Sequence, residues 1–141
     1  MGFLEGAKGP MFGGAVLLPD GRTVATADGA QDLKLWDLKT QKELATLRGE
    51  TWAHFALAVS PDGRRLAAGG ASPVVRLWDS ASHQQVALLK VSPPAAFGWL
   101  AFSADGNLLV LVDNQQTIHT WRAPSWAEIE AAEKKTALKT Q

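Results

Sequence analysis

The chain lacks several features that would point to particular classes of protein. It has no cysteine, so it can form no disulfide, no thiolate nucleophile and no cysteine-bearing zinc site, and we expect a reducing, cytoplasmic location. Its 14 basic and 14 acidic residues give a net charge of zero, without the basic excess of a general nucleic-acid binder. Apolar runs such as 108–112 are far shorter than the ~20 residues of a membrane helix. We therefore predict no nucleic-acid partner and no membrane partner.

Catalytic motifs are also missing from the sequence. His54, His83 and His119 have no repeat relation to one another, and none lies in a metal-binding or nucleophile motif. The stretch Gly69-Gly70-Ala71-Ser72 lacks the lysine and the helix of a phosphate-binding loop. No Gly-x-Ser-x-Gly nucleophile elbow occurs. We predict that the chain is not an enzyme and that it binds no cofactor and no metal.

An internal repeat of 42–43 residues is the strongest positive signal. Two markers repeat with these steps, and each tryptophan follows its aspartate by 16 residues. The markers are the Asp-Gly pairs Asp20-Gly21, Asp62-Gly63 and Asp105-Gly106 and the tryptophans Trp36, Trp78 and Trp121. Because glycine accepts the positive φ of a tight turn, each Asp-Gly pair predicts a hairpin, and the carboxylates are explained by turn chemistry.

Each repeat unit reads as a set of short strands. The first strands (14–18, 56–60 and 99–103) are nearly continuous apolar runs, which predicts burial on both faces. Second strands are expected at 23–26, 65–68 and 108–111, third strands at 33–36, 74–78 and 117–121, and fourth strands at 43–47 and 85–89. A four-stranded unit of ~40–45 residues is a β-propeller blade, so the predicted class is all-β.

The dipeptides Trp36-Asp37 and Trp78-Asp79 complete a resemblance to the WD-repeat family, from which Trp121-Arg122 departs. The resemblance implies three four-stranded antiparallel WD-type blades in an incomplete ring. We place this propeller segment at 1–122, with blades at about 11–49, 53–90 and 97–122. It also implies a non-catalytic scaffold for protein–protein interaction. The two matched tryptophans are expected to be buried.

The chain departs from the family at the buried polar tetrad. The histidine that often follows a glycine before the first strand is replaced in Gly6-Ala7 and Gly49-Glu50. The aspartate six residues before the tryptophan is replaced by Ala30, Ser72 and Gln115. Thr26 could fill the hydroxyl position of the first blade, but it would lack its partners. We therefore predict that the tetrad is missing from all three blades.

We predict a strand near the start of the sequence and a helix near its end. By the family resemblance, residues 3–10 look like the end of a fourth strand that leads into a new blade. Because the family often closes its rings with an N-terminal strand, we expect a possible closing strand at 1–6. Residues 123–141 form a predicted helical tail, in which Ser125 and Glu128 suit a capping box for a helix over about 126–135 packed on the propeller. The chain also resembles the C-terminal ends of larger bacterial propeller proteins, some of them joined to kinase domains.

Three tryptophans lie outside the repeat series. Trp52 precedes the predicted first strand at 56–60, Trp99 begins the one at 99–103, and Trp126 lies in the tail. Packing is the favoured role for each of them, and partner binding is the alternative. Three blades alone leave two apolar faces without neighbours, so we expect a homo-oligomer or a longer chain that supplies the other blades. The partner protein is not identified by the sequence. A small-ligand or carbohydrate-binding propeller and an accessory domain of a longer signalling protein are the alternative functions.

Overall fold

The computed structural model describes residues 14–27, 32–48, 54–95 and 97–123, together with 131, 134–135 and 137–139. These residues form short β-strands in the repeating order that the sequence predicts. The strands are β1 (Ala15–Leu17), β2 (Thr23–Ala27), β3 (Leu33–Asp37), β4 (Lys42–Leu47), β5 (His54–Val59), β6 (Arg65–Gly70), β7 (Val74–Asp79), β8 (Gln85–Lys90), β9 (Phe97–Phe102), β10 (Leu108–Asp113) and β11 (Ile118–Arg122).

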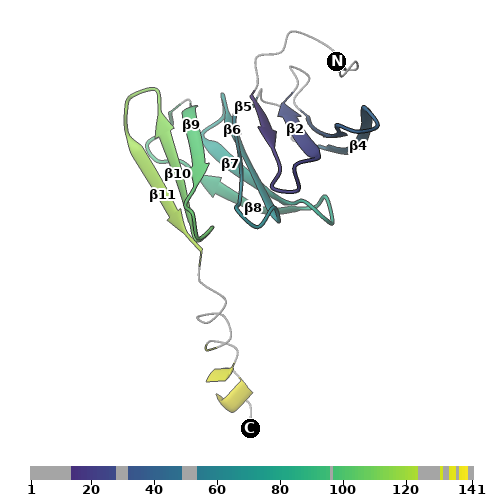
Figure 1. Ribbon diagram of the computed structural model, residues 1–141. Helices are drawn as coiled ribbons and strands as arrows, with labels where there is room; N and C mark the ends of the chain where they lie inside the picture. The colour runs from purple at the N-terminus through teal and green to yellow at the C-terminus, as the bar shows by residue number, and fades with distance from the viewer. Residues whose placement is uncertain are drawn as a thin grey trace.

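The strands form three separate antiparallel sheets, which we call blade 1 (β1–β4), blade 2 (β5–β8) and blade 3 (β9–β11). Within each blade, neighbouring strands in the chain are neighbours in the sheet. Figure 1 shows the blades side by side, with blade 2 between the purple-blue blade 1 and the green blade 3. The predicted class, an open set of propeller blades, is confirmed. Among the described residues blade 3 has three strands, whereas blades 1 and 2 have four.

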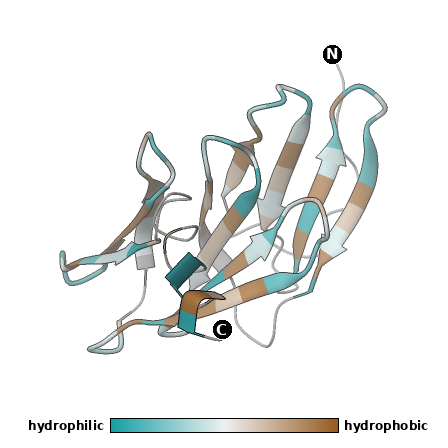
Figure 2. Ribbon diagram, turned by 90° about the horizontal axis from the view of Figure 1, so that it is seen from below, coloured by the Kyte–Doolittle hydropathy of each residue, from teal (hydrophilic) through white to brown (hydrophobic). Residues whose placement is uncertain are grey.

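The blades are held together by apolar contacts between their faces. The first cluster joins blades 1 and 2 through side chains that include Leu33, Leu35, Leu66 and Trp78. The second joins blades 2 and 3 through side chains that include Val75 and Leu111. In Figure 2 the hydrophobic segments lie along the strands and many turns are hydrophilic. Each core therefore lies between two blades, and the cohesion of the molecule depends on blade stacking.

The first strands differ in burial according to the place of their blade. In β5, Ala56 and Ala58 belong to the cluster toward blade 3, while Leu57 and Val59 pack against the cluster toward blade 1. The prediction of burial on both faces is therefore right for blade 2. It is wrong for the two outer blades, where Leu17 of β1 is 52% exposed and Trp99 of β9 is 57% exposed. In the part of the chain that the structure describes, blades 1 and 3 each have one blade neighbour, so one face of each first strand has no partner sheet there.

The expectation about Thr26 needs correction. The indole Nε1 of Trp36 donates a hydrogen bond of 2.8 Å to the Thr26 hydroxyl. Thr26 thus has one of the partners that it was expected to lack, because β2 and β3 place the two side chains on the same face of blade 1. Trp36 and Trp78 are both buried, as predicted.

The described part of the tail is helical and exposed. Helical residues occur at Ala131, Lys134, Lys135 and 137–139, so described helical residues also lie beyond the predicted end at Lys135. All of them are exposed, and Leu138 is 73% exposed. Trp126, for which packing is the favoured role, lies outside the described residues, as does the closing strand expected at 1–6.

We predict that Trp78→Ala lowers the free energy of unfolding by about 3–5 kcal/mol, because truncation of a fully buried indole leaves a cavity between blades 1 and 2. Leu138→Ala is the control and should cost less than about 1 kcal/mol, since that side chain is 73% exposed in the tail. Chemical denaturation measures both values. A loss below about 1 kcal/mol for Trp78→Ala would contradict the role of this indole in the core.

Candidate functional site

The three Asp-Gly pairs form the turns between the first and second strands of each blade. Gly21, Gly63 and Gly106 have φ values of 66°, 73° and 73°, a conformation that suits glycine. The aspartates before them accept hydrogen bonds within the same turns. Asp20 accepts from the Arg22 and Thr23 amides, Asp62 from the Ser60 hydroxyl and the Arg64 amide, and Asp105 from the Ser103 hydroxyl and the Asn107 amide.

These turn contacts act on the charge state of the carboxylates. The hydrogen bond from the Thr23 hydroxyl is the main reason that the pKa of Asp20 is lowered. Hydrogen bonds from the Ser60 and Ser103 hydroxyls similarly lower the pKa values of Asp62 and Asp105. Each carboxylate therefore stays ionised at neutral pH and orders its own turn, which leaves it poorly suited to general acid catalysis.

The aspartates of the Trp-Asp pairs cap the turns between the third and fourth strands. Asp37 accepts hydrogen bonds from the amides of Lys39 and Thr40, at 2.8 and 3.1 Å. Asp79 accepts from the amides of Ala81 and Ser82, at 3.1 and 2.7 Å. Blade 3 has Arg122 at this place. The dipeptide thus stabilises the turn that leads into a fourth strand, and blade 3 has neither the aspartate nor, among its described residues, that strand.

Asp37 has an additional ion pair. Nε of Arg22 donates to Oδ2 of Asp37 at 2.9 Å, and Nη2 of the same guanidinium donates to the same oxygen. The Asp37 side chain is 7% exposed and that of Arg22 is 56% exposed, so solvent reaches the pair from the arginine side. The hydrogen bonds from Arg22 lower the pKa of Asp37 to about 2.

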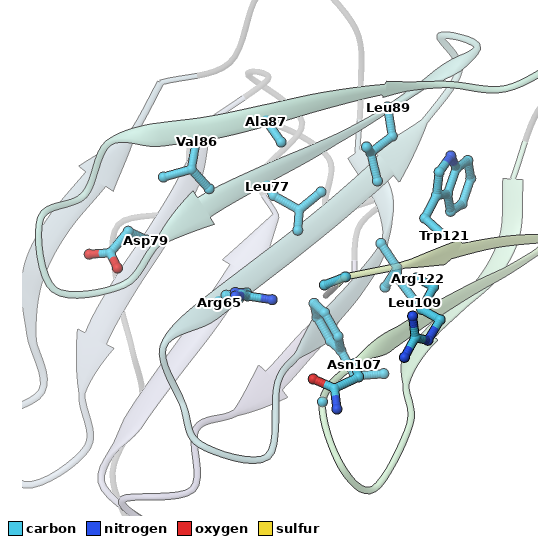
Figure 3. A pocket seen from close by; sticks show the side chains of 13 residues that line it. Arg65, Leu77, Asp79, Val86, Ala87, Leu89, Asn107, Leu109, Trp121 and Arg122 are labelled. Atoms are coloured by element: carbon cyan, nitrogen blue, oxygen red, sulfur yellow. The ribbon is translucent and has the colours of Figure 1, made fainter. Parts of the chain in front are cut away.

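A groove lies between blades 2 and 3, beside the edge of β11 that pairs with no other described strand. Its volume is about 450 Å³. Leu77, Val86 and Leu89 come from blade 2, and Leu109 and Trp121 come from blade 3 (Figure 3). Polar side chains add to the lining; they are Arg65, Asp79, Asn107 and Arg122. The groove thus combines apolar side chains with charged groups of both signs.

A smaller groove lies at the equivalent place between blades 1 and 2. Its volume is about 280 Å³, and it is lined by Leu35, Leu44 and Gly63, among others. These residues correspond in the repeat to Leu77, Val86 and Gly106 of the larger groove. The two grooves are thus repeats of one feature, and the larger one adjoins the blade in which three strands are described.

The outer face of blade 3 presents an exposed apolar row. Trp99 pairs with Val112 across β9 and β10, and Val112 pairs with Ile118 across β10 and β11, so the three side chains share one face. Trp99 is 57% exposed and Ile118 is 66% exposed. The packing role favoured for Trp99 is therefore wrong in this chain, since no sheet of the described residues covers this face. Trp121 is half-buried on the other face, and Trp52 and Trp126 lie outside the described residues.

The contact between His119 and Asp113 was not predicted from the sequence. Nε2 of His119 lies 2.9 Å from Oδ2 of Asp113, and that carboxylate also accepts from the Gln115 and Thr117 amides. The hydrogen bond with His119 is the main cause of the lowered pKa of Asp113. The sequence does hold a signal for this contact, because Asp113 closely follows the predicted strand 108–111 and His119 lies in the predicted strand 117–121. The amide contacts tie Asp113 to that turn, which favours a structural role.

The described residues offer neither a metal-binding cluster nor a membrane-spanning helix. They contain no group of three or more histidine and acidic side chains that could hold a metal ion. No helix among the described residues is long and apolar enough to cross a membrane.

Comparison with known proteins gives a family match and a shared fold. Residues 41–79 match the model of the WD domain, G-beta repeat. This range starts just before β4 and ends at Asp79 of the Trp78-Asp79 dipeptide, and its 39 residues make up most of one repeat of 42–43 residues. No curated protein has a sequence that significantly matches the chain.

Two solved structures resemble the chain over 84% of its length. "Structure of U3-55K" has a TM-score of 0.78 and 21% identity, and the chain covers 38% of it. "Crystal structure of RRP9 WD40 repeats" also has a TM-score of 0.78 and 21% identity, and the chain covers 37% of it. The chain thus has the fold of part of a WD40 propeller and spans less than two fifths of these two structures.

We predict a loss of stability in acid to which Asp37 contributes. Its pKa of about 2 in the folded chain lies below the ordinary value of 3.8, so its contribution is present above about pH 4 and is lost as the pH falls toward 2. Asp37→Asn should reduce the fall in the urea midpoint between pH 5 and pH 2, because the amide does not titrate. Equal falls in the two proteins would contradict the assigned role of this carboxylate.

Proposed function

We propose that the chain is a non-catalytic WD-repeat scaffold that binds other proteins. The observation that carries this proposal is the exposed row of Trp99, Val112 and Ile118 on the outer face of blade 3. Apolar side chains gathered on one rigid face are typical of protein contacts, and tryptophan is enriched among the residues that dominate binding energy. The described carboxylates of the repeat serve turns, which fits a scaffold better than a catalyst.

The nature of the exposed faces favours a partner that continues the propeller. The faces that join blades 1 and 2 and blades 2 and 3 are apolar, and the exposed row on blade 3 has the same character. We infer that a further blade, from another copy or from additional repeats, stacks there. A chain that carries its own rigid β-sheets needs little ordering upon such an association, which limits the entropic cost. The cytoplasmic location expected from the lack of cysteine stays a prediction.

Exposure of Trp99 also supports the second candidate, a small-ligand or carbohydrate-binding propeller. A mostly exposed indole on a rigid strand can stack on a sugar ring or another flat ligand. Ile118 distinguishes the two candidates, because a protein interface covers the whole row, whereas a stacking platform needs mainly the indole.

The corresponding prediction uses Ile118→Asp. A charged side chain in the centre of an apolar contact must be desolvated, so the affinity for a protein partner should fall at least tenfold. The partner is to be captured from lysate on the immobilised wild-type chain, identified, and titrated against both proteins by calorimetry. Leu138→Asp, which changes an exposed residue of the tail, should leave the affinity unchanged.

A glycan array separates the candidates directly. Sugar binding that is abolished by Trp99→Ala and retained by Ile118→Asp, without a captured protein that responds to Ile118→Asp, would overturn the scaffold proposal in favour of the ligand-binding one.

A further inference from the structure

The outer face of blade 3 differs in side-chain size from the faces that already carry a neighbouring blade. One row of side chains across the first three strands can be matched in all three blades, because these strands pair in the same register. The rows are Gly14, Ala27 and Leu33 in blade 1, Ala56, Gly69 and Val75 in blade 2, and Trp99, Val112 and Ile118 in blade 3. Blades 1 and 2 thus begin this row with two small residues, whereas blade 3 begins it with tryptophan and valine.

The small residues make room for the first strand of the next blade. β1 lies beside β5, and β5 lies beside β9. Ala56 and Leu100 belong to the same core cluster, and Leu57 packs against the cluster that contains Ala27. In both contacts between blades, a leucine from the first strand of the next blade therefore packs against a row that begins with two small residues.

An indole in this row takes the space that such a leucine needs. Trp99 is 57% exposed in the single chain, whereas Ala56 at the matched position is 6% exposed. A leucine placed against Trp99 would force the two sheets apart, because closely packed contacts tolerate additional side-chain volume poorly. A blade that covers Trp99 therefore needs a small residue at the position of Leu57 and Leu100.

Blade 1 has a small residue at this position. Ala15 precedes Leu57 by 42 residues, and Leu57 precedes Leu100 by 43, which are the steps of the repeat. Because Val16 packs toward blade 2, the exposed Ala15 beside it lies on the opposite face, the outer face of blade 1. Leu17 shares that outer face and is 52% exposed. The two outer faces thus reverse the sizes of the inner contacts: the large side chain lies on blade 3 and the small one on blade 1.

Resting on the interaction role proposed above for the outer face of blade 3, we propose that this face packs on the outer face of blade 1 of a second copy, with Trp99 over Ala15. Within one chain blade 2 lies between the two faces, so they meet only between copies (Figure 1). The indole then fills the space that alanine leaves, and the sheets approach as closely as the blades of one chain do. Leu17 and Ile118, which are 52% and 66% exposed in the single chain, are covered in the same contact.

Two single substitutions disturb this fit in opposite ways. Trp99→Ala leaves a cavity over Ala15, and Ala15→Leu places a leucine against Trp99, so each should weaken self-association at least tenfold. Light scattering over a range of concentrations measures the effect. The natural chain should exceed its chain mass of 15.1 kDa and approach that mass on dilution. Urea denaturation of the dilute proteins checks that each variant is folded.

A mixture of the two variants should recover the fit. One contact between the Trp99→Ala chain and the Ala15→Leu chain joins Trp99 to Ala15, as in the natural protein. The other joins the introduced leucine to the introduced alanine, the combination that Leu100 and Ala56 form between blades 3 and 2. The equimolar mixture and the double variant Trp99→Ala/Ala15→Leu should both associate within about threefold of the natural chain. Leu138→Asp in the exposed tail is the control and should leave the association of the natural chain unchanged.

Any one of three results would overturn the contact of Trp99 with Ala15. These are a natural chain that keeps a mass of 15.1 kDa at every concentration, single variants that associate as strongly as the natural chain, and a mixture that associates as weakly as its two components. A different protein whose binding depends on Ile118 would in each of these cases leave the scaffold function standing, so the two proposals can fail separately.

Discussion

The structure depends on one constraint, which is that a blade with two apolar faces needs a neighbouring blade on each side. Blade 2 has both neighbours, and its residues enter both core clusters. Among the described residues blades 1 and 3 each have one, which explains why Leu17 and Trp99 are exposed although their strands are as apolar as β5. Since burial is worth roughly 25 cal/mol per Å² of apolar surface, these faces are also where association gains most.

The polar contacts described above stabilise single blades and do not join one blade to the next. Asp20 and Asp62 stabilise the turns between the first and second strands, and Asp37 and Asp79 stabilise those between the third and fourth strands. The Thr26 hydroxyl accepts a hydrogen bond from the indole of Trp36. These bonds are satisfied inside one sheet, so they make each blade a rigid unit without specifying its neighbour. The apolar row of Trp99, Val112 and Ile118 and the edge of β11, which among the described strands pairs with β10 alone, take no part in these bonds.

Sequence reasoning succeeded where the signal is local and repeated. The Asp-Gly turns and the alternation before Trp78 predict strands whose positions agree with the structure to within a few residues. It failed for contacts that depend on the pairing of particular strands. His119 and Asp113 come together only because the β10–β11 hairpin brings their side chains to one face, and Thr26 reaches Trp36 through the β2–β3 register.

By itself the sequence determined the repeat length, the strand order within each blade, the turn chemistry and the burial of Trp36 and Trp78, because backbone hydrogen bonding and side-chain alternation act over short distances. Only the tertiary structure decided that Trp99 and Ile118 lie exposed on one face and that the groove beside β11 is wider than its repeat. An apolar strand reads the same whether or not a neighbouring sheet covers it. Exposure depends on how the blades stack, and stacking is a property of the whole assembly.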